Sequence, residues 1–297
     1  MQPKTVVASG SARRHAHADP LWVKWTLISL AVLIVTVLVI VPIVSVFHQA
    51  FAGGFREYWN SLVNDSDTRH SVYLTMIVAP VAVVMNVVFG VAAAWLITRF
   101  HFPGRTLLTT LIDLPFAVSP VVAGLSFMLL FGMEGYWGPW LRDHGIKIAF
   151  GYPALVLVTA FVTVPFVARE LIPVMEALGA DEEIAAVSLG ANGWQVFWRI
   201  TVPNIKWGLL YGVILCNARA MGEFGAVHVV SGHIAGQTDT MPLRVEKLFQ
   251  EYNNPGAFAV ASVLTFLALI TLFIKTWLER KTEQELADAA KAVDVSG

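Results

Sequence analysis

Two oppositely charged residues stand four positions apart inside an apolar stretch of this 297-residue sequence. Arg219 and Glu223 both fall within the apolar segment 207–230. A charged side chain in the middle of a membrane costs about 2.5–3.5 kcal/mol on insertion scales, so it needs a partner or a purpose. Residues four apart share one face of a helix, so these two can form a neutral pair inside a helix bundle. Alternatively, Arg219 can line a path and compensate the charge of a passing anion.

Motifs for bond chemistry are missing. The sequence contains neither a GxxxxGK[ST] phosphate loop nor an HExxH motif. Its eight histidines are scattered without metal-ligand spacing, and its single cysteine, Cys216, cannot form a disulfide within the chain. We therefore expect no catalytic residues, no metal site and no cofactor bound by this chain. A membrane enzyme is only a remote alternative.

The composition points to the membrane. Hydrophobic residues make up 56% of the chain, charged residues only 14%, and the mean hydropathy is +0.65. A soluble domain carries about 25% charged residues. The net charge of −1 argues against a nucleic-acid partner. We expect an all-α, polytopic membrane protein.

Six apolar segments are long enough, or nearly so, to cross a bilayer, which takes about 20 residues. The segments are residues 26–47, 72–97, 107–131, 152–168, 207–230 and 257–274. With the N-terminus inside, 13 of the 20 Lys and Arg residues fall in cytoplasmic segments and six fall outside. The positive-inside rule therefore places both termini in the cytoplasm.

The chain divides by this topology into four parts. Residues 1–25 form a cytoplasmic N-terminal tail, and residues 26–68 contain the first transmembrane helix and a periplasmic loop. Residues 69–278 are expected to form the membrane core, with a cytoplasmic loop at about 176–203, and residues 279–297 a cytoplasmic tail that could be helical. The first segment, with about 20 apolar residues, exceeds the 7–15 of a signal peptide, so we expect it to remain as a span.

The loop between the fourth and fifth segments carries the capping residues of two short helices. Asp181 is a candidate N-cap of the first helix, and Gly190 is a candidate stop just beyond its end. Asn192 is a candidate N-cap of a second helix that reaches Ile200. Pro203 is expected to prevent that helix from continuing. On physical grounds alone, the first helix could dock on a protein or lie on the bilayer surface.

This loop resembles the cytoplasmic motif of ABC importer permeases, which reads EAA, three residues, Gly, nine residues, I-x-L-P. Two positions depart from it, because Ile184 stands where the family has Glu and Val202 where it has Leu. In that family the motif docks into a cleft of the ATPase subunit. The residues matched to this coupling role are Glu183, Ala185, Ala186, Gly190, Ile200 and Pro203.

The fifth segment resembles a narrower group. Residues 217–226 read NARAMGEFGA, similar to the R-A-x-G-E-F-G-A signature of sulfate and molybdate permeases. Residues 113–124 and 230–246 are similar to sulfate/thiosulfate permease subunits. The resemblance implies a type I ABC importer fold in a bacterial inner membrane. It also implies a paralogous permease, an ATPase subunit dimer that binds ATP and Mg²⁺, and a periplasmic sulfate-binding protein.

Breaks in the third segment add a further candidate for the translocation path. Ser119 and Pro120 predict a broken helix, and broken helices often line cavities in transporters. Asp113 precedes Pro115 and is expected to satisfy backbone groups locally. The candidate path residues are thus Arg219, Glu223 and Ser119. Two alternatives stay open: a molybdate or tungstate ABC permease, and a gradient-driven secondary anion transporter.

Overall fold

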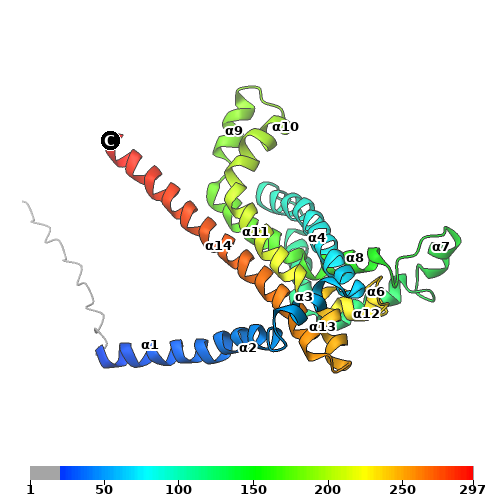
Figure 1. Ribbon diagram of the computed structural model, residues 1–297. Helices are drawn as coiled ribbons and strands as arrows, with labels where there is room; N and C mark the ends of the chain where they lie inside the picture. Colours follow the sequence, from blue (N-terminus) through cyan, green and yellow to red (C-terminus); the bar gives the residue numbers. More distant parts are fainter. Residues whose placement is uncertain (1–20, 297) are drawn as a thin grey trace, which may run out of the picture. The chain divides into compact units, whose positions relative to one another are not determined.

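The computed structural model describes residues 21–296 and divides into two units, residues 1–45 and 46–297 (Figure 1). The first unit contains α1 (Leu21–Val35), the π-helix η1 (Thr36–Ile40) and the start of α2 (Val41–Ala50). With the rest of α2, which belongs to the second unit, they form one 29-residue apolar helix from Trp22 to Ala50, long enough to span a membrane. The predicted N-terminal tail lies almost entirely outside the described residues.

The second unit is built from helices and their connections, and no strand occurs between residues 21 and 296. Its helices are α3 (Phe55–Val63), α4 (Ser66–Arg99), α5 (Arg105–Ala117), α6 (Pro120–Phe131), α7 (Gly138–Asp143), α8 (Tyr152–Leu178), α9 (Asp181–Ser188), α10 (Gly193–Val196), the π-helix η2 (Phe197–Thr201), α11 (Val202–Met221), α12 (Gly225–Ser231), α13 (Met241–Gln250) and α14 (Asn254–Ser296).

Each predicted apolar segment lies on one long helix or on a bent pair of helices. Four single helices in the described chain are long and apolar enough to cross a membrane, and the number rises to six if two bent helix pairs each count as one span. The bent pairs are α5 with α6, at 110°, and α10 to α11 with α12, at 53°. The fourth span is longer than its expected 152–168, because α8 continues for 27 residues through Arg169 and Glu170.

Helices α4 and α8 pack side by side and form the centre of the second unit. Leu155, Leu171 and Met175 of α8 are completely buried there. Gly90 of α4 permits the close approach, because a Cβ at that position would lie 2.8 Å from a methyl carbon of Val167. Small residues allow membrane helices to pack closely in this way.

The expected stop at Pro203 is wrong. The helix that begins at Gly193 continues through η2 into α11 as far as Met221. In η2 the backbone bonds shift to the i→i+5 pattern, and the N–H of Val202 donates to the carbonyl of Phe197. Pro203 then falls in the first turn of α11, where the missing N–H is tolerated.

Candidate functional site

The loop between α8 and α11 folds into two short helices, as the capping residues predicted. Gly190 adopts φ of 90°, which favours glycine, immediately after α9. Asn192 and Gln195 form a reciprocal capping box at the start of α10. Asp181 is not the N-cap; Ala180 holds that position, and Asp181 lies in the first turn with two glutamates, where the helix dipole favours acidic residues.

Glu183 faces inward and fastens this loop to the end of α4. Its two carboxylate oxygens accept hydrogen bonds from Nε and Nη2 of Arg99, at 2.8 and 3.3 Å. The hydroxyl of Thr201 also donates to Glu183, at 2.8 Å. Arg99 donates a further bond to the carbonyl of Met175, at 3.1 Å. The Arg99 and Glu183 side chains are only 11% and 15% exposed, so this pair, the Arg99–Glu183 clamp, is little screened by solvent.

The opposite face of α9 is open and largely apolar. Ile184, Val187 and Leu189 are exposed, and Leu189 reaches 90%. Ala185 is exposed beside them, whereas Ala186 is half-buried. The alanine side chains project little from the backbone on this exposed face of α9, so another surface can approach the helix closely there. Of the remaining predicted coupling residues, Gly190 and Pro203 are exposed and Ile200 is half-buried.

The second set of predicted residues lies at the other end of α11, where the helix bends into α12. Arg219 Nη1 lies 2.6 Å from Glu223 Oε2, so the sequence-predicted ion pair is present. The other carboxylate oxygen of Glu223 accepts a bond from the backbone N–H of Ala226, at 2.9 Å. Glu223 is 1% exposed and Arg219 is 35% exposed. Glu223 therefore holds the bend, while part of the Arg219 guanidinium stays accessible.

The break at Ser119 lies beside this bend. Ser119 is exposed between α5 and α6, and α6 packs against α12. A Cβ at Gly225 would lie 3.2 Å from the Cβ of Pro120, and one at Gly124 would lie 2.7 Å from the Ala226 carbonyl. The two bent spans thus meet at their elbows through glycine, which brings the predicted path residues into one region.

A second ion pair crosses between two spans in the same unit. Arg169 of α8 donates to both carboxylate oxygens of Asp113 in α5, at 2.7 and 2.9 Å. The guanidinium also lies 5.3 Å from the ring centroid of Phe116. The expectation that Asp113 acts locally is wrong, because its partner comes from another helix 56 residues along the chain. Pro115 stays within α5, and the break falls later, at Ser119.

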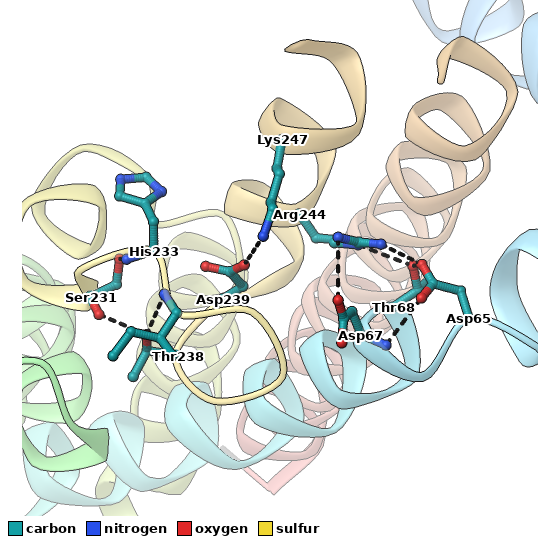
Figure 2. A network of polar contacts seen from close by, with 10 residues as sticks. Asp65, Asp67, Thr68, Ser231, His233, Thr238, Asp239, Arg244 and Lys247 are labelled. Carbon is teal, nitrogen blue, oxygen red and sulfur yellow. Dashed lines mark hydrogen bonds and ion pairs between the residues drawn. The ribbon is translucent and has the colours of Figure 1, made fainter. Parts of the chain in front are cut away.

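Sequence reasoning missed a polar network at the start of α4. Arg244 of α13, only 7% exposed, lies 2.5 Å from Asp65 and 3.9 Å from Asp67, and it donates to Thr68 at 3.3 Å (Figure 2). Burial raises the pKa of Asp65, but the bonds from Thr68 and Arg244 outweigh it and hold that pKa below its usual 3.8. The network fixes α13 to α4. No signal in the local sequence pairs residues 179 positions apart.

Known proteins resemble this chain along most of its length. Residues 86–284 match the family model described as binding-protein-dependent transport system inner membrane component. The chain is 52% identical over 264 residues to the sulfate transport system permease protein CysW of Escherichia coli (strain K12), covering 89% of this chain and 90% of that protein. It is 48% identical to CysW of Synechocystis, covering 88% of this chain and 94% of that protein. It is 38% identical to the sulfate transport system permease protein CysT of E. coli K12, with 82% and 87% covered.

The fold has solved counterparts. A crystal structure of a bacterial ABC transporter involved in alginate import superposes with a TM-score of 0.69 at 15% identity, covering 89% of this chain and 96% of that one. At this identity the likeness shows the fold alone, and it confirms the expected all-α permease architecture. The family match covers the helices that carry both candidate sites, from α4 to α14. This chain belongs to the family of inner membrane components of binding-protein-dependent transport systems.

Proposed function

We propose that this chain is the transmembrane permease subunit of an ATP-driven sulfate importer that also takes thiosulfate. The observation that carries the proposal is the 52% identity over 89% of the chain to a relative named for sulfate transport. The signature at residues 217–226 supports it, because those residues build the elbow with Arg219 and Glu223. The chain supplies a path and performs no bond chemistry.

Its partners would be a paralogous permease, two ATPase subunits and a periplasmic sulfate-binding protein. The similarity to both CysW and CysT supports a pore built from two related chains. ATP and Mg²⁺ would bind to the ATPase subunits. The exposed face of α9 would fit an ATPase cleft, because its apolar side chains lie on a loop that the Arg99–Glu183 clamp holds to the end of α4.

Both termini would lie in the cytoplasm, on the same side as α9. Within the second unit, Lys275, midway along α14, lies 5.1 Å from the ring centroid of Tyr211, midway along α11. Figure 1 shows the end of α14 and α9 at the same end of α11. The excess of basic residues in the predicted inner segments supports the same orientation.

In the path, Arg219 would provide the positive charge for a dianion. Its guanidinium is paired with Glu223 in this conformation, and a fully paired arginine attracts an anion weakly. An alternating-access cycle that loosens the pair in one state would expose the charge at that stage only. Ser119, exposed at the neighbouring elbow, would add a hydroxyl donor to the same region.

The first test is uptake of labelled sulfate in cells with and without the gene, in a strain that lacks a second sulfate importer. We expect ATP-dependent uptake that requires the gene and is competed by thiosulfate but not by molybdate. Unchanged sulfate uptake on deletion would refute the sulfate assignment. Competition by molybdate at equal concentration would instead favour a molybdate or tungstate permease.

The second test separates an ABC permease from a gradient-driven transporter. An ATPase should co-purify with the wild-type chain and be lost on Gly190→Pro, because proline cannot adopt φ of 90°. Val187→Asp should also lose it by placing a charge on the exposed face of α9. Ala235→Asp is the matched control, since Ala235 is exposed in the loop between α12 and α13. Retention of the ATPase by both α9 variants would refute docking at this face.

A further inference from the structure

Two histidines and a glutamate meet where α12 faces α13, at the end of α11 remote from α9. His228 Nδ1 lies 3.2 Å from Glu246 Oε2, and the rings of His228 and His233 have centroids 4.3 Å apart. One ligand atom from each of the three residues lies within 4.8 Å of the other two. His228 and Glu246 are partly exposed and His233 is exposed, so a hydrated ion can reach them.

The backbone between the two helices is shaped to bring His233 back to His228. Gly232 and His233 adopt φ of 67° and 53°, so α12 ends in a turn with two consecutive left-handed residues. The hydroxyl of Ser231 accepts a bond from the His233 N–H at 3.2 Å, and Thr238 donates to the Ser231 carbonyl at 2.6 Å. Figure 2 shows this turn and the His233 ring that projects from it.

From this geometry we infer that His228, His233 and Glu246 form a binding site for a transition-metal cation of the Zn²⁺ class. Imidazole and carboxylate suit Zn²⁺, and two His with one Glu is a ligand set known from zinc sites that keep an open position. Tetrahedral Zn²⁺ with bonds near 2.1 Å places neighbouring ligand atoms about 3.4 Å apart. The 3.2 Å between His228 and Glu246 is close to that spacing. The His233 ligand atom lies within 4.8 Å of the other two and would have to move closer to complete the set.

A further contact orients the glutamate for this role. The amide nitrogen of Gln250, one turn along α13, donates to Glu246 Oε1 at 3.1 Å. The other oxygen, Oε2, is the one directed at His228. Hydrogen bonds of this kind fix the orientation of metal-binding carboxylates.

A bound cation would bridge α12 and α13 through metal–ligand bonds, in place of the direct His228–Glu246 contact. Since Arg244 fixes α13 to the start of α4, the cation couples the turn after the α11–α12 elbow to α4. The bound ion therefore restricts the segment between α12 and α13. Cation binding at this segment does not depend on which anion the transporter carries.

The test is Zn²⁺ binding to the assembled transporter in lipid nanodiscs, with affinity tags removed. Isothermal titration should give one site per copy of this chain, and that site should disappear in His233→Ala and in Glu246→Gln. Gln250→Ala should weaken it by roughly tenfold, as expected for a residue that orients a ligand. His144→Ala is the matched control, because His144 is another exposed histidine, whose ring contacts the ring and the carbonyl of Trp140.

Two results would overturn the inference. The first is a wild-type transporter with no Zn²⁺ site beyond the background of the double variant His233→Ala/Glu246→Gln. The second is a site that survives in either single variant. Because a variant could misfold, Cu²⁺ electron paramagnetic resonance on the wild type provides an independent measurement, with hyperfine structure from two imidazole nitrogens expected and its absence refuting the site. Hydrogen exchange at residues 232–239 should slow on Zn²⁺ addition in the wild type but not in Glu246→Gln.

Discussion

Replacing Glu183 by alanine should loosen the loop that carries α9. The substitution removes two bonds to Arg99 and one from Thr201, and it leaves the Arg99 guanidinium, only 11% exposed, with a single carbonyl partner. Hydrogen bonds to charged groups contribute about 1.5–3 kcal/mol each, and breaking a buried ion pair costs about 3–5 kcal/mol. Since the pair retains some exposure, we expect a loss of about 2–3 kcal/mol in the free energy of local opening.

Native-state hydrogen exchange of the α9 amides measures this quantity directly. A loss of about 2–3 kcal/mol corresponds to exchange faster by roughly 30- to 150-fold, since 1.4 kcal/mol is a factor of ten. Glu182→Ala is the matched control: the neighbouring glutamate is exposed and accepts one bond from Asn204. Exposed contacts contribute about 0–1 kcal/mol, so the control should change exchange by less than about fivefold.

A double-mutant cycle with Arg99→Ala completes the design. If the two side chains act as one clamp, the double variant should cost much less than the two single variants added together. Exchange in Glu183→Ala within threefold of that in Glu182→Ala would refute the reasoning. So would strictly additive effects of Arg99→Ala and Glu183→Ala.

Three further outcomes follow from the fold. Arg219→Ala should reduce both assembly and uptake, because it leaves the Glu223 carboxylate buried without its partner, at a cost of about 3–5 kcal/mol. The double variant Arg219→Ala/Glu223→Ala should restore assembly, measured by size-exclusion chromatography. If Arg219 serves the path, sulfate uptake should stay lost in the double variant. Gly90→Val should lower the melting temperature of the purified chain, with an overpacking cost of about 1–3 kcal/mol or more, whereas Gly193→Ala should not, since no atom lies within 4 Å of a Cβ there. Asp65→Asn should destabilise the chain by a constant amount from pH 7 to about 4. The folded pKa of Asp65 lies below the unfolded value of about 3.9, so the stabilisation that ionised Asp65 gives the wild type is lost only as the pH falls below about 4. Melting curves of both proteins at pH 3–7 check this.

Apolar runs and local capping residues were enough to predict the helices of the spans and the two short helices between α8 and α11. Long apolar segments predicted the helices that could span a membrane, and Asn192 predicted the start of α10 because capping depends on residues only three positions apart. The Ser119–Pro120 break was predictable for the same reason, since proline acts on its own turn. The Arg219–Glu223 pair was predictable because both residues lie on one helix.

Contacts between distant helices escaped prediction. Glu183 pairs with Arg99, 84 residues away in the sequence, and Asp113 pairs with Arg169, 56 residues away. No local sequence pattern specifies such partners. The expected helix end at Pro203 was wrong because proline usually stops a helix that precedes it. Here the π-helix η2 places Pro203 in the first turn of α11, where proline is tolerated. The histidine cluster depends on two left-handed residues after α12, so the spacing of His228 and His233 alone carried no metal-site signal.

The continuous helix from Gly193 to Met221 has a mechanical consequence. At about 1.5 Å per residue it is a rod of about 42 Å, and Gly208 and Gly212 press it against α8 near its middle, with contacts of 3.0 and 3.3 Å to the positions that a Cβ would occupy. The midpoint of these glycines forms a pivot about 26 Å from the start of α10 and about 17 Å from the end of α11 at Met221, where the elbow begins. A push of about 3 Å on the loop would swing the elbow by about 2 Å in the opposite direction. The position of these two glycines along the helix thus sets how far the Arg219–Glu223 pair moves for a given displacement of the loop.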